Sequence, residues 1–169
     1  MRPWVVGGFL CCMVLSAYAG EPASGLLDPP VIKLSLDGKP AYSLDRAALA
    51  AFPRTTVKTA ANGEPQSAWQ GVALEDIVER VCVASGDSLY GRALARFVRV
   101  TAANGAQVVF SAAELAPDYG KTEVILADTK DGKPLEQGAP FRLVVPGDKR
   151  TDRWISHVTA IEVVDASTP

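Results

Sequence analysis

The sequence predicts a single α+β domain of short strands in mixed or mostly antiparallel pairing, with a few short helices. Short segments rich in β-branched and apolar residues follow one another at close intervals along the chain. Only a few segments carry the period of an amphipathic helix. The chain has 169 residues, of which 48% are hydrophobic, and this length is natural for one domain with a real core.

The strand predictions rest on local composition and on turn signals. The apolar run 124–127 is typical of a strand buried on both faces. The tetrapeptide Asp-Gly-Lys-Pro occurs at 37–40 and again at 131–134, where it predicts tight turns, and Asn104-Gly105 predicts a hairpin. The predicted strands are 31–36, 55–59, 97–102, 107–110, 124–127, 141–145 and 155–164.

Three helices are predicted. The first covers 44–52, with Ser43 as its cap, and Pro53 ends it. The segment 69–72 leads into the second, which begins near Leu74 and has a continuous apolar face. A Ser-Ala-Ala-Glu capping box at 111–114 starts a short third helix that ends near Pro117.

The first nineteen residues have the pattern of a signal peptide. Arg2 gives a positive start, 5–15 is an apolar core too short to span a membrane comfortably, and 17–19 is a small-x-small cleavage site. No twin-arginine pair is present, which favours export as an unfolded chain. We therefore expect a signal peptide at 1–19, a flexible lead-in at 20–30, one domain at 31–165, and a periplasmic or secreted location.

The charge and the rare residues exclude several function classes. The formal net charge is −2 without a basic stripe, which gives no support to nucleic-acid binding. Cys82 is the one cysteine after the leader, so we expect no internal disulfide, and a small buried side chain is the favoured interpretation. His157 is the single histidine, so a catalytic triad or a histidine metal site is hard to build.

The most unusual residue is Arg142, a guanidinium in the otherwise apolar strand 141–145. Such a charge is costly unless something anionic meets it. Lys149, Arg150 and Arg153 follow within eleven residues, so these cations could together hold a phosphate or a carboxylate. The alternative is that Asp148 and Asp152 neutralise the loop, and that Arg142 pairs with a structural carboxylate.

Several motifs occur in one order: Trp-Gln-Gly-Val-Ala-Leu from position 69, Ala-Arg-Phe-Val-Arg-Val-Thr-Ala from 95, and Gly-Ala-Pro-Phe-Arg-Leu-Val-Val-Pro-Gly from 138. With Asp-Gly-Lys-Pro-Leu before the last of these and Arg-Trp-Ile after it, the chain resembles the molybdopterin-binding domain of the sulfite oxidase family. Its spacing is similar to that of the bacterial periplasmic methionine-sulfoxide reductase catalytic subunit. The resemblance covers roughly 31–164. It implies a sulfite-oxidase-type α+β fold and a molybdopterin cofactor.

The resemblance also implies a set of cofactor-binding positions, but not all of them carry the family's residues. The family's molybdenum-ligating cysteine falls at Thr59, whose neutral hydroxyl is a poor ligand for this metal. Gln137 stands where the family has an asparagine, and Arg142 matches the family's arginine. Arg153 matches a later basic residue, with Lys149 close by and Thr101 at a strand end.

Three hypotheses follow. The first is an exported, non-catalytic domain that binds an anionic small molecule or a partner protein in the former cofactor groove, through Arg142, Arg153 and Lys149. The second is a molybdenum-cofactor oxidoreductase that acts on sulfite or sulfoxide-type substrates. The third is a sensory or assembly module that works with a membrane protein.

Overall fold

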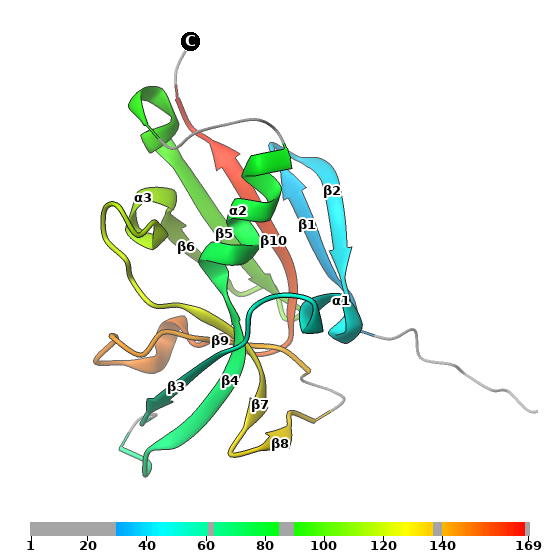
Figure 1. Ribbon diagram of the computed structural model, residues 1–169, viewed down its shortest axis with the longest axis vertical. Helices are drawn as coiled ribbons and strands as arrows, with labels where there is room; N and C mark the ends of the chain where they lie inside the picture. Colours follow the sequence, from blue (N-terminus) through cyan, green and yellow to red (C-terminus); the bar gives the residue numbers. More distant parts are fainter. Residues whose placement is uncertain (1–29, 61–62, 85–89, 137–139, 168–169) are drawn as a thin grey trace, which may run out of the picture.

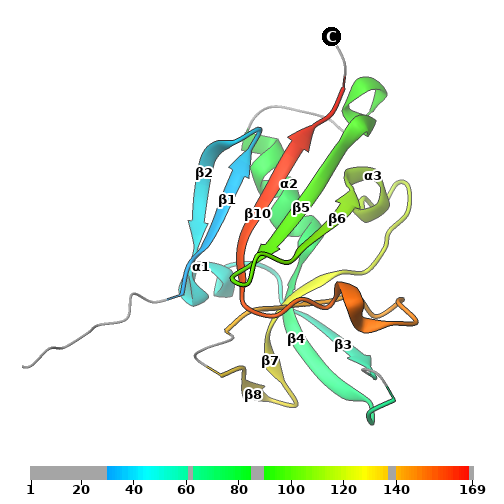
Figure 2. The same ribbon diagram turned by 180° about the vertical axis from the view of Figure 1, so that it is seen from behind.

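A computed structural model describes residues 30–60, 63–84, 90–136 and 140–167, with the side chains of 83 and 84 left out. Two sheets make up the fold, one in each half of the molecule in both views (Figures 1 and 2). The first sheet has the strand order β2 (Lys39–Leu44), β1 (Ile32–Leu36), β10 (Val158–Asp165), β5 (Arg96–Ala102), β6 (Gln107–Ser111). The second has the order β3 (Thr55–Thr59), β4 (Ser67–Ala73), β7 (Ile125–Lys130), β8 (Lys133–Pro134), and β9 (Arg142–Val144) also pairs with β7.

The pairing is mixed, as predicted. Strand β1 runs parallel to β10, and the other pairs are antiparallel. The helices are short: α1 (Arg46–Ala50), α2 (Leu74–Ala84), α3 (Ala112–Leu115), and the 3-10 turns η1 (Gly91–Ala95) and η2 (Thr151–Arg153).

Helix α2 lies over one face of the first sheet (Figure 1), and the reverse view shows the other face of that sheet (Figure 2). Its apolar side chains Leu74, Ile77 and Val81 are buried, as the predicted stripe requires. One hydrophobic cluster includes residues of both sheets and of α2, so a single core holds the two halves together.

The two Asp-Gly-Lys-Pro segments form the same kind of hairpin. Asp37 and Gly38 have φ values of 48° and 74°, and Asp131 and Gly132 have 49° and 75°. Positive φ at both central positions is the geometry that favours Asp-Gly in tight hairpins. Each aspartate also accepts a hydrogen bond from a backbone N–H of another strand, that of Asp165 for Asp37 and that of Ala68 for Asp131.

Several predicted elements are different in the structure. Residues 39–44 form strand β2 rather than a turn and the start of a helix, so the first helix is only α1, and Asp45 caps it instead of Ser43. The segment 69–72 lies within strand β4. The hydroxyl of Ser111 makes no capping hydrogen bond at α3, and the closing strand begins at Val158 instead of 155.

The predicted signal peptide at 1–19 and all but the last residue of the lead-in at 20–30 lie outside the described residues. Within the described part of the chain, no helix has the length and apolarity needed to cross a membrane.

Candidate functional site

The candidate site is built on three neighbouring strands of the second sheet. Gly71 of β4 lies opposite Ala127 of β7, which in turn lies opposite Arg142 of β9. Directly paired residues in antiparallel strands project from the same face. Gly71 also lies against the backbone of β7, because a Cβ atom there would be 2.1 Å from the carbonyl oxygen of Leu126. Small residues in this row therefore leave the face above it to two long side chains, Trp69 and Arg142.

Arg142 stacks on Trp69, and its Nε lacks a hydrogen-bond partner among the described residues. Its Cζ lies 5.3 Å from the centre of the indole ring, a cation–π distance. Its Nε is buried and has no partner among the described residues, and the same holds for Nε1 of Trp69, a side chain only 2% exposed. A buried donor without an acceptor costs about 1–3 kcal/mol. Two such donors in contacting side chains are the main chemical anomaly of the described structure.

Two further residues contact the same indole. Lys130 lies opposite Trp69 in the sheet, and its Nζ is 5.0 Å from the ring centre. The ammonium of Lys130 also lies 3.8 Å from the carboxylate of Glu64, in an exposed ion pair. Trp154 packs edge-on against Trp69 at 6.1 Å and donates its own Nε1–H to the carbonyl oxygen of Val145. The site thus has two cations on one buried indole.

Thr59, where the resemblance places the family's cysteine, is buried at the end of β3 and lies opposite Ser67. It does not meet Arg142. Thr55, at the other end of β3, belongs to the row of Gly71, Ala127 and Arg142. From strand spacing and rise, the Cα of Thr59 is therefore about 14 Å across and about 13 Å along the sheet from that of Arg142. A small anion held by Arg142 does not reach the hydroxyl of Thr59.

Arg153 is already neutralised. Its Nε and Nη2 donate to both carboxylate oxygens of Asp148 at 2.8 and 2.6 Å, and its Nη1 lies 3.5 Å from Glu114. The hydrogen bonds to Asp148 raise the pKa of Arg153 further above its ordinary value. Its Cζ also lies 4.8 Å from the ring centre of Phe110. Arg150 pairs with Asp152 in the same loop. For these two cations the alternative of a self-neutralised loop is confirmed.

The remaining predicted positions are scattered. Lys149 is exposed and makes no ion pair within the described residues. Thr101 lies in β5 of the other sheet, where its hydroxyl accepts a 3.4 Å hydrogen bond from Gln107. Gln137 lies outside the described residues. Cys82 is in the last turn of α2, which Figure 1 shows at the end of the helix away from β9. It packs against the core, but it is only partly buried, whereas a buried side chain was predicted.

An arginine–aspartate network supports β9 and was not predicted. Arg54 binds both carboxylate oxygens of buried Asp128 at 2.8 and 2.6 Å. Arg46 of α1 donates to the carbonyl oxygens of Asp128, Leu135 and Pro140, so that one guanidinium ties together three points on the excursion from β7 to β9. A sequence signal existed, because Asp128 directly follows the both-faces-buried run 124–127 and a carboxylate there needs a partner.

Opposing effects act on the pKa of Asp128. Burial alone would raise it, but the hydrogen bonds from Arg54 and from the hydroxyl of Thr129, with the charges of Arg54 and Arg46, bring it below its ordinary value. Asp128 is therefore an ionised structural carboxylate, and its oxygens already accept hydrogen bonds from Arg54 and Thr129.

The donor set decides whether a molybdenum–pterin cofactor fits. No group of three or more His, Cys, Asp or Glu side chains within the described residues is placed to hold a metal ion. Thr59 supplies a hydroxyl where the resemblance implies a thiolate, and Arg153 is paired with the carboxylates of Asp148 and Glu114. Arg142 fits an anionic group. The described residues therefore fit the anionic part of such a cofactor at one point and do not fit its metal.

Comparisons with known proteins identify the family and the fold of the chain. The solved structure of the sulfane dehydrogenase SoxCD from Paracoccus pantotrophus matches with a TM-score of 0.59 and 21% sequence identity. The match covers 82% of this chain and only 39% of that one, and at this identity it supports the fold alone. It confirms the predicted sulfite-oxidase-type arrangement of mixed sheets with a few short helices. No curated protein matches the chain. A family model described as the oxidoreductase molybdopterin binding domain matches residues 45–169, and the chain belongs to this family.

Proposed function

We propose that this chain is a non-redox member of its family that binds a small anionic ligand at Arg142. The observation that carries the proposal is the buried Nε of Arg142, which lacks a partner within the described residues. The guanidinium stacks on Trp69, whose Nε1 also lacks a partner there. An acceptor oxygen at these donors would remove a cost of about 1–3 kcal/mol per donor. Charge-assisted hydrogen bonds from a guanidinium to an oxyanion are among the strongest in proteins.

The residues of the site have distinct roles in this proposal. Arg142 supplies the charge and a fork of donors, and Trp69 supplies a rigid apolar platform and one N–H. Lys130 supplies a second positive charge near the same ring, with Glu64 as its present counter-ion. Arg46 and Arg54 bind Asp128 and the ends of the loop that leads into β9, and so fix the position of Arg142.

The binding test uses the chain's own tryptophans. Beyond the leader, Trp69 and Trp154 are the only two in the sequence, and both are buried in this region. We expect inorganic phosphate or sulfate to change the intrinsic fluorescence of the full chain and to bind measurably by calorimetry. Arg142→Met should weaken binding at least about tenfold, as expected for one charged hydrogen-bond donor.

Arg150→Met is the matched control, because Arg150 is an exposed arginine of a nearby loop with its own partner Asp152. It should leave the affinity unchanged. Equal anion binding by the wild type and Arg142→Met, or no binding of either anion up to high concentration, would contradict the proposal.

The second candidate is a molybdenum-cofactor oxidoreductase that acts on sulfite or sulfoxide-type substrates, and family membership favours it. The two candidates differ in metal content. We expect the full chain, produced in cells that make the cofactor, to contain no stoichiometric molybdenum by mass spectrometry. Thr59→Cys, which supplies the thiol that the family uses, is the matched variant. Stoichiometric molybdenum in the wild-type protein would overturn the non-redox proposal and establish the second candidate.

We also propose that the protein is exported, on the basis of its leader sequence. A chain exported unfolded would not carry a cofactor inserted before export, which agrees with a non-redox role. Intact-mass measurement of the protein from the expressing cell should show an N-terminus at Gly20. An N-terminus at Met1 in a soluble cytosolic fraction would contradict export.

A further inference from the structure

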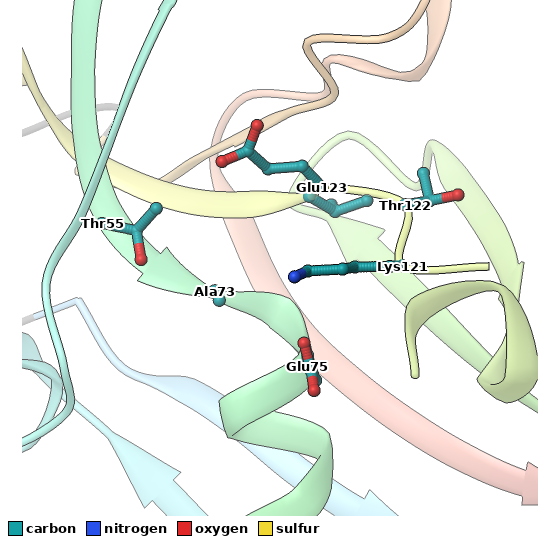
Figure 3. A pocket seen from close by; sticks show the side chains of 7 residues that line it. Thr55, Ala73, Glu75, Lys121, Thr122 and Glu123 are labelled. Atoms are coloured by element: carbon teal, nitrogen blue, oxygen red, sulfur yellow. The ribbon is translucent and has the colours of Figure 1, made fainter. Parts of the chain in front are cut away.

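A surface hollow lies apart from Arg142. It has a volume of about 360 Å³ and is located where β3 begins, β4 runs into α2 and the segment 121–124 enters β7 (Figure 3). Thr55 lines it, at the opposite end of β3 from Thr59 and three strands from Arg142 in the same row of the sheet. None of the residues that line the hollow is Arg142, Trp69 or Lys130, so the hollow and the anion site are separate.

The walls of the hollow are fixed by backbone hydrogen bonds. The N–H of Leu74 donates to the carbonyl oxygen of Val124 at 2.8 Å, which joins the start of α2 to the entry of β7. The N–H groups of Gly120, Lys121 and Thr122 donate to carbonyl oxygens of Ala113, Ala116 and Glu114 at 3.1, 3.1 and 2.8 Å. These backbone hydrogen bonds hold the loop in place, and the loop in turn places Lys121 at the hollow.

Lys121 has a backbone that few non-glycine residues adopt, with φ of 47°. Gly120 before it lies so close to α3 that a Cβ atom would be 2.6 Å from the carbonyl oxygen of Glu114. The loop can therefore follow this path only with a glycine at 120, and Lys121 accepts a strained conformation next to it.

Opposite charges line the hollow without pairing. In Figure 3 the Lys121 side chain extends across the hollow toward Ala73 and Thr55, with Glu75 on one side and Glu123 on the other. Within the described residues no ion pair of 4 Å or less joins Lys121 to either glutamate. The charge of Lys121 nevertheless acts on Glu75. Burial, followed by the charges of Asp76 and Glu79, raises the pKa of Glu75 above its ordinary value, and the charge of Lys121 opposes part of this shift.

The charge arrangement selects the class of ligand. A simple anion would meet Lys121 but also two carboxylates, and a simple cation would meet the carboxylates but also the ammonium. A zwitterion gives each of its charges an opposite partner. A water takes up about 30 Å³ in the liquid, so a volume of about 360 Å³ has room for a small amino acid. The half-buried Ala73 offers apolar surface for a short side chain.

We propose that this hollow binds a free α-amino acid, with its carboxylate at Lys121 and its ammonium group at Glu75, the glutamate on which the charge of Lys121 acts. The binding mode needs both charges of the ligand. It also needs both Lys121 and Glu75, so each partner can be removed separately by substitution in the protein and by deletion in the ligand.

The test is a titration of the full chain with valine, followed by the amide signals of the segment 120–124 in ¹H–¹⁵N NMR spectra. The two matched analogues are isovalerate, which lacks the ammonium group, and isobutylamine, which lacks the carboxylate. We expect millimolar binding of valine and at least about tenfold weaker binding of either analogue.

Lys121→Gln should bring the affinity for valine down about tenfold and leave that for isobutylamine equal or higher, because it removes a repelling charge. Glu75→Gln should weaken the binding of valine and of isobutylamine, which both carry an ammonium group, and should leave the affinity for isovalerate equal or higher. Lys149→Gln, at an exposed lysine outside the hollow, should change neither. Absence of shifts at 120–124 with 50 mM valine, taken as about fifty times a millimolar constant, would overturn the proposal, as would equal binding of valine and isovalerate.

Discussion

Arg142 and Arg153 are two arginines of similar surroundings and opposite chemistry. Each guanidinium lies over a fully buried aromatic ring, at 5.3 Å from Trp69 and 4.8 Å from Phe110. Arg153 has both oxygens of Asp148 and one of Glu114 as partners, whereas Arg142 has a buried Nε with no acceptor within the described residues. One region is electrostatically complete and the other is not.

The difference shows how a structural arginine can be told from a binding one. A charge that the fold keeps for stability brings its own carboxylate, because an unpaired buried donor lowers stability. Arg54 follows this rule, with the bidentate contact to Asp128. Arg142 does not, although the strands around it are held closely. A site that is rigid but incomplete is better explained by a partner from outside the chain than by its own folding.

The strongest test of the rigidity of the Arg142 region is Gly71→Ala. A Cβ atom at this position would be 2.1 Å from the carbonyl oxygen of Leu126 and 2.6 Å from Cα of Ala127, both backbone atoms that cannot turn aside. We expect a loss of unfolding free energy of about 3 kcal/mol or more, measured by urea denaturation. Gly63→Ala, where a Cβ atom would meet nothing within 4 Å, is the comparison, although its φ of 81° adds strain of its own. A cost for Gly71→Ala no larger than for Gly63→Ala would mean that β4 and β7 are not held closely.

Asp128→Asn tests directly whether an arginine that has its own carboxylate, here Arg54, contributes to stability through that pair. The substitution leaves Arg54 without its buried carboxylate, and we expect a loss of about 2–3 kcal/mol, less than for a fully buried pair because Arg54 is partly exposed. Asp152→Asn is the control, because its pair with Arg150 is exposed on both sides and should change stability by less than about 0.5 kcal/mol. Equal effects in chemical denaturation would contradict the role of Asp128.

The contribution of Asp128 to the unfolding free energy should depend on pH. Because the pKa of Asp128 is lower in the folded protein than its ordinary value of about 3.9, its stabilisation is complete above that value. It is then lost as the pH falls through the folded-state pKa, where the carboxylate becomes protonated in both states. We therefore expect the stability difference between wild type and Asp128→Asn to be constant from pH 7 to about pH 5 and to shrink below about pH 4. A difference that grows on acidification would have the wrong sign.

Much of the fold could be predicted because its signals are local. The Asp-Gly-Lys-Pro turns, the run 124–127, the stripe of α2 and the strand 55–59 each depend on a few adjacent residues. Strand β2 could not be recognised in this way, because five of its six residues are exposed and it is a strand through its pairing with β1. That pairing takes Ser43 out of the helix and leaves Asp45 as the cap. Strand β4 was missed because its glycine interrupts the alternation.

The site was predictable in its central residue and not in its partners. Arg142 is conspicuous because it interrupts an apolar strand. In the sequence, Asp148 is five residues from Arg153 and Glu114 is 39 residues from it. Neither separation shows that Arg153 has carboxylate partners whereas the Nε of Arg142 has none within the described residues. The contact of Arg142 with Trp69 and the tie made by Arg46 depend on the order of β4, β7 and β9, which residue patterns do not specify.

The comparison itself is tested by Arg142→Met and Arg153→Met, which remove the two guanidinium groups and keep an unbranched side chain over each ring. Arg153→Met should lower the unfolding free energy by about 1 kcal/mol, because it breaks a partly exposed pair with Asp148 and leaves Glu114 without its cation. Arg142→Met loses a cation–π contact of about 0.5–1 kcal/mol but also removes a buried donor that has no acceptor, which costs about 1–3 kcal/mol. The balance predicts a protein that is as stable as the wild type or about 1 kcal/mol more stable, measured by thermal and urea unfolding in buffer without phosphate or sulfate.

Added phosphate should then stabilise the wild type and not Arg142→Met, because a ligand raises stability only where it binds the folded state. If Arg142→Met proved as destabilising as Arg153→Met in the absence of any anion, Arg142 would be a structural residue like its counterpart, and the distinction between the two regions would be lost.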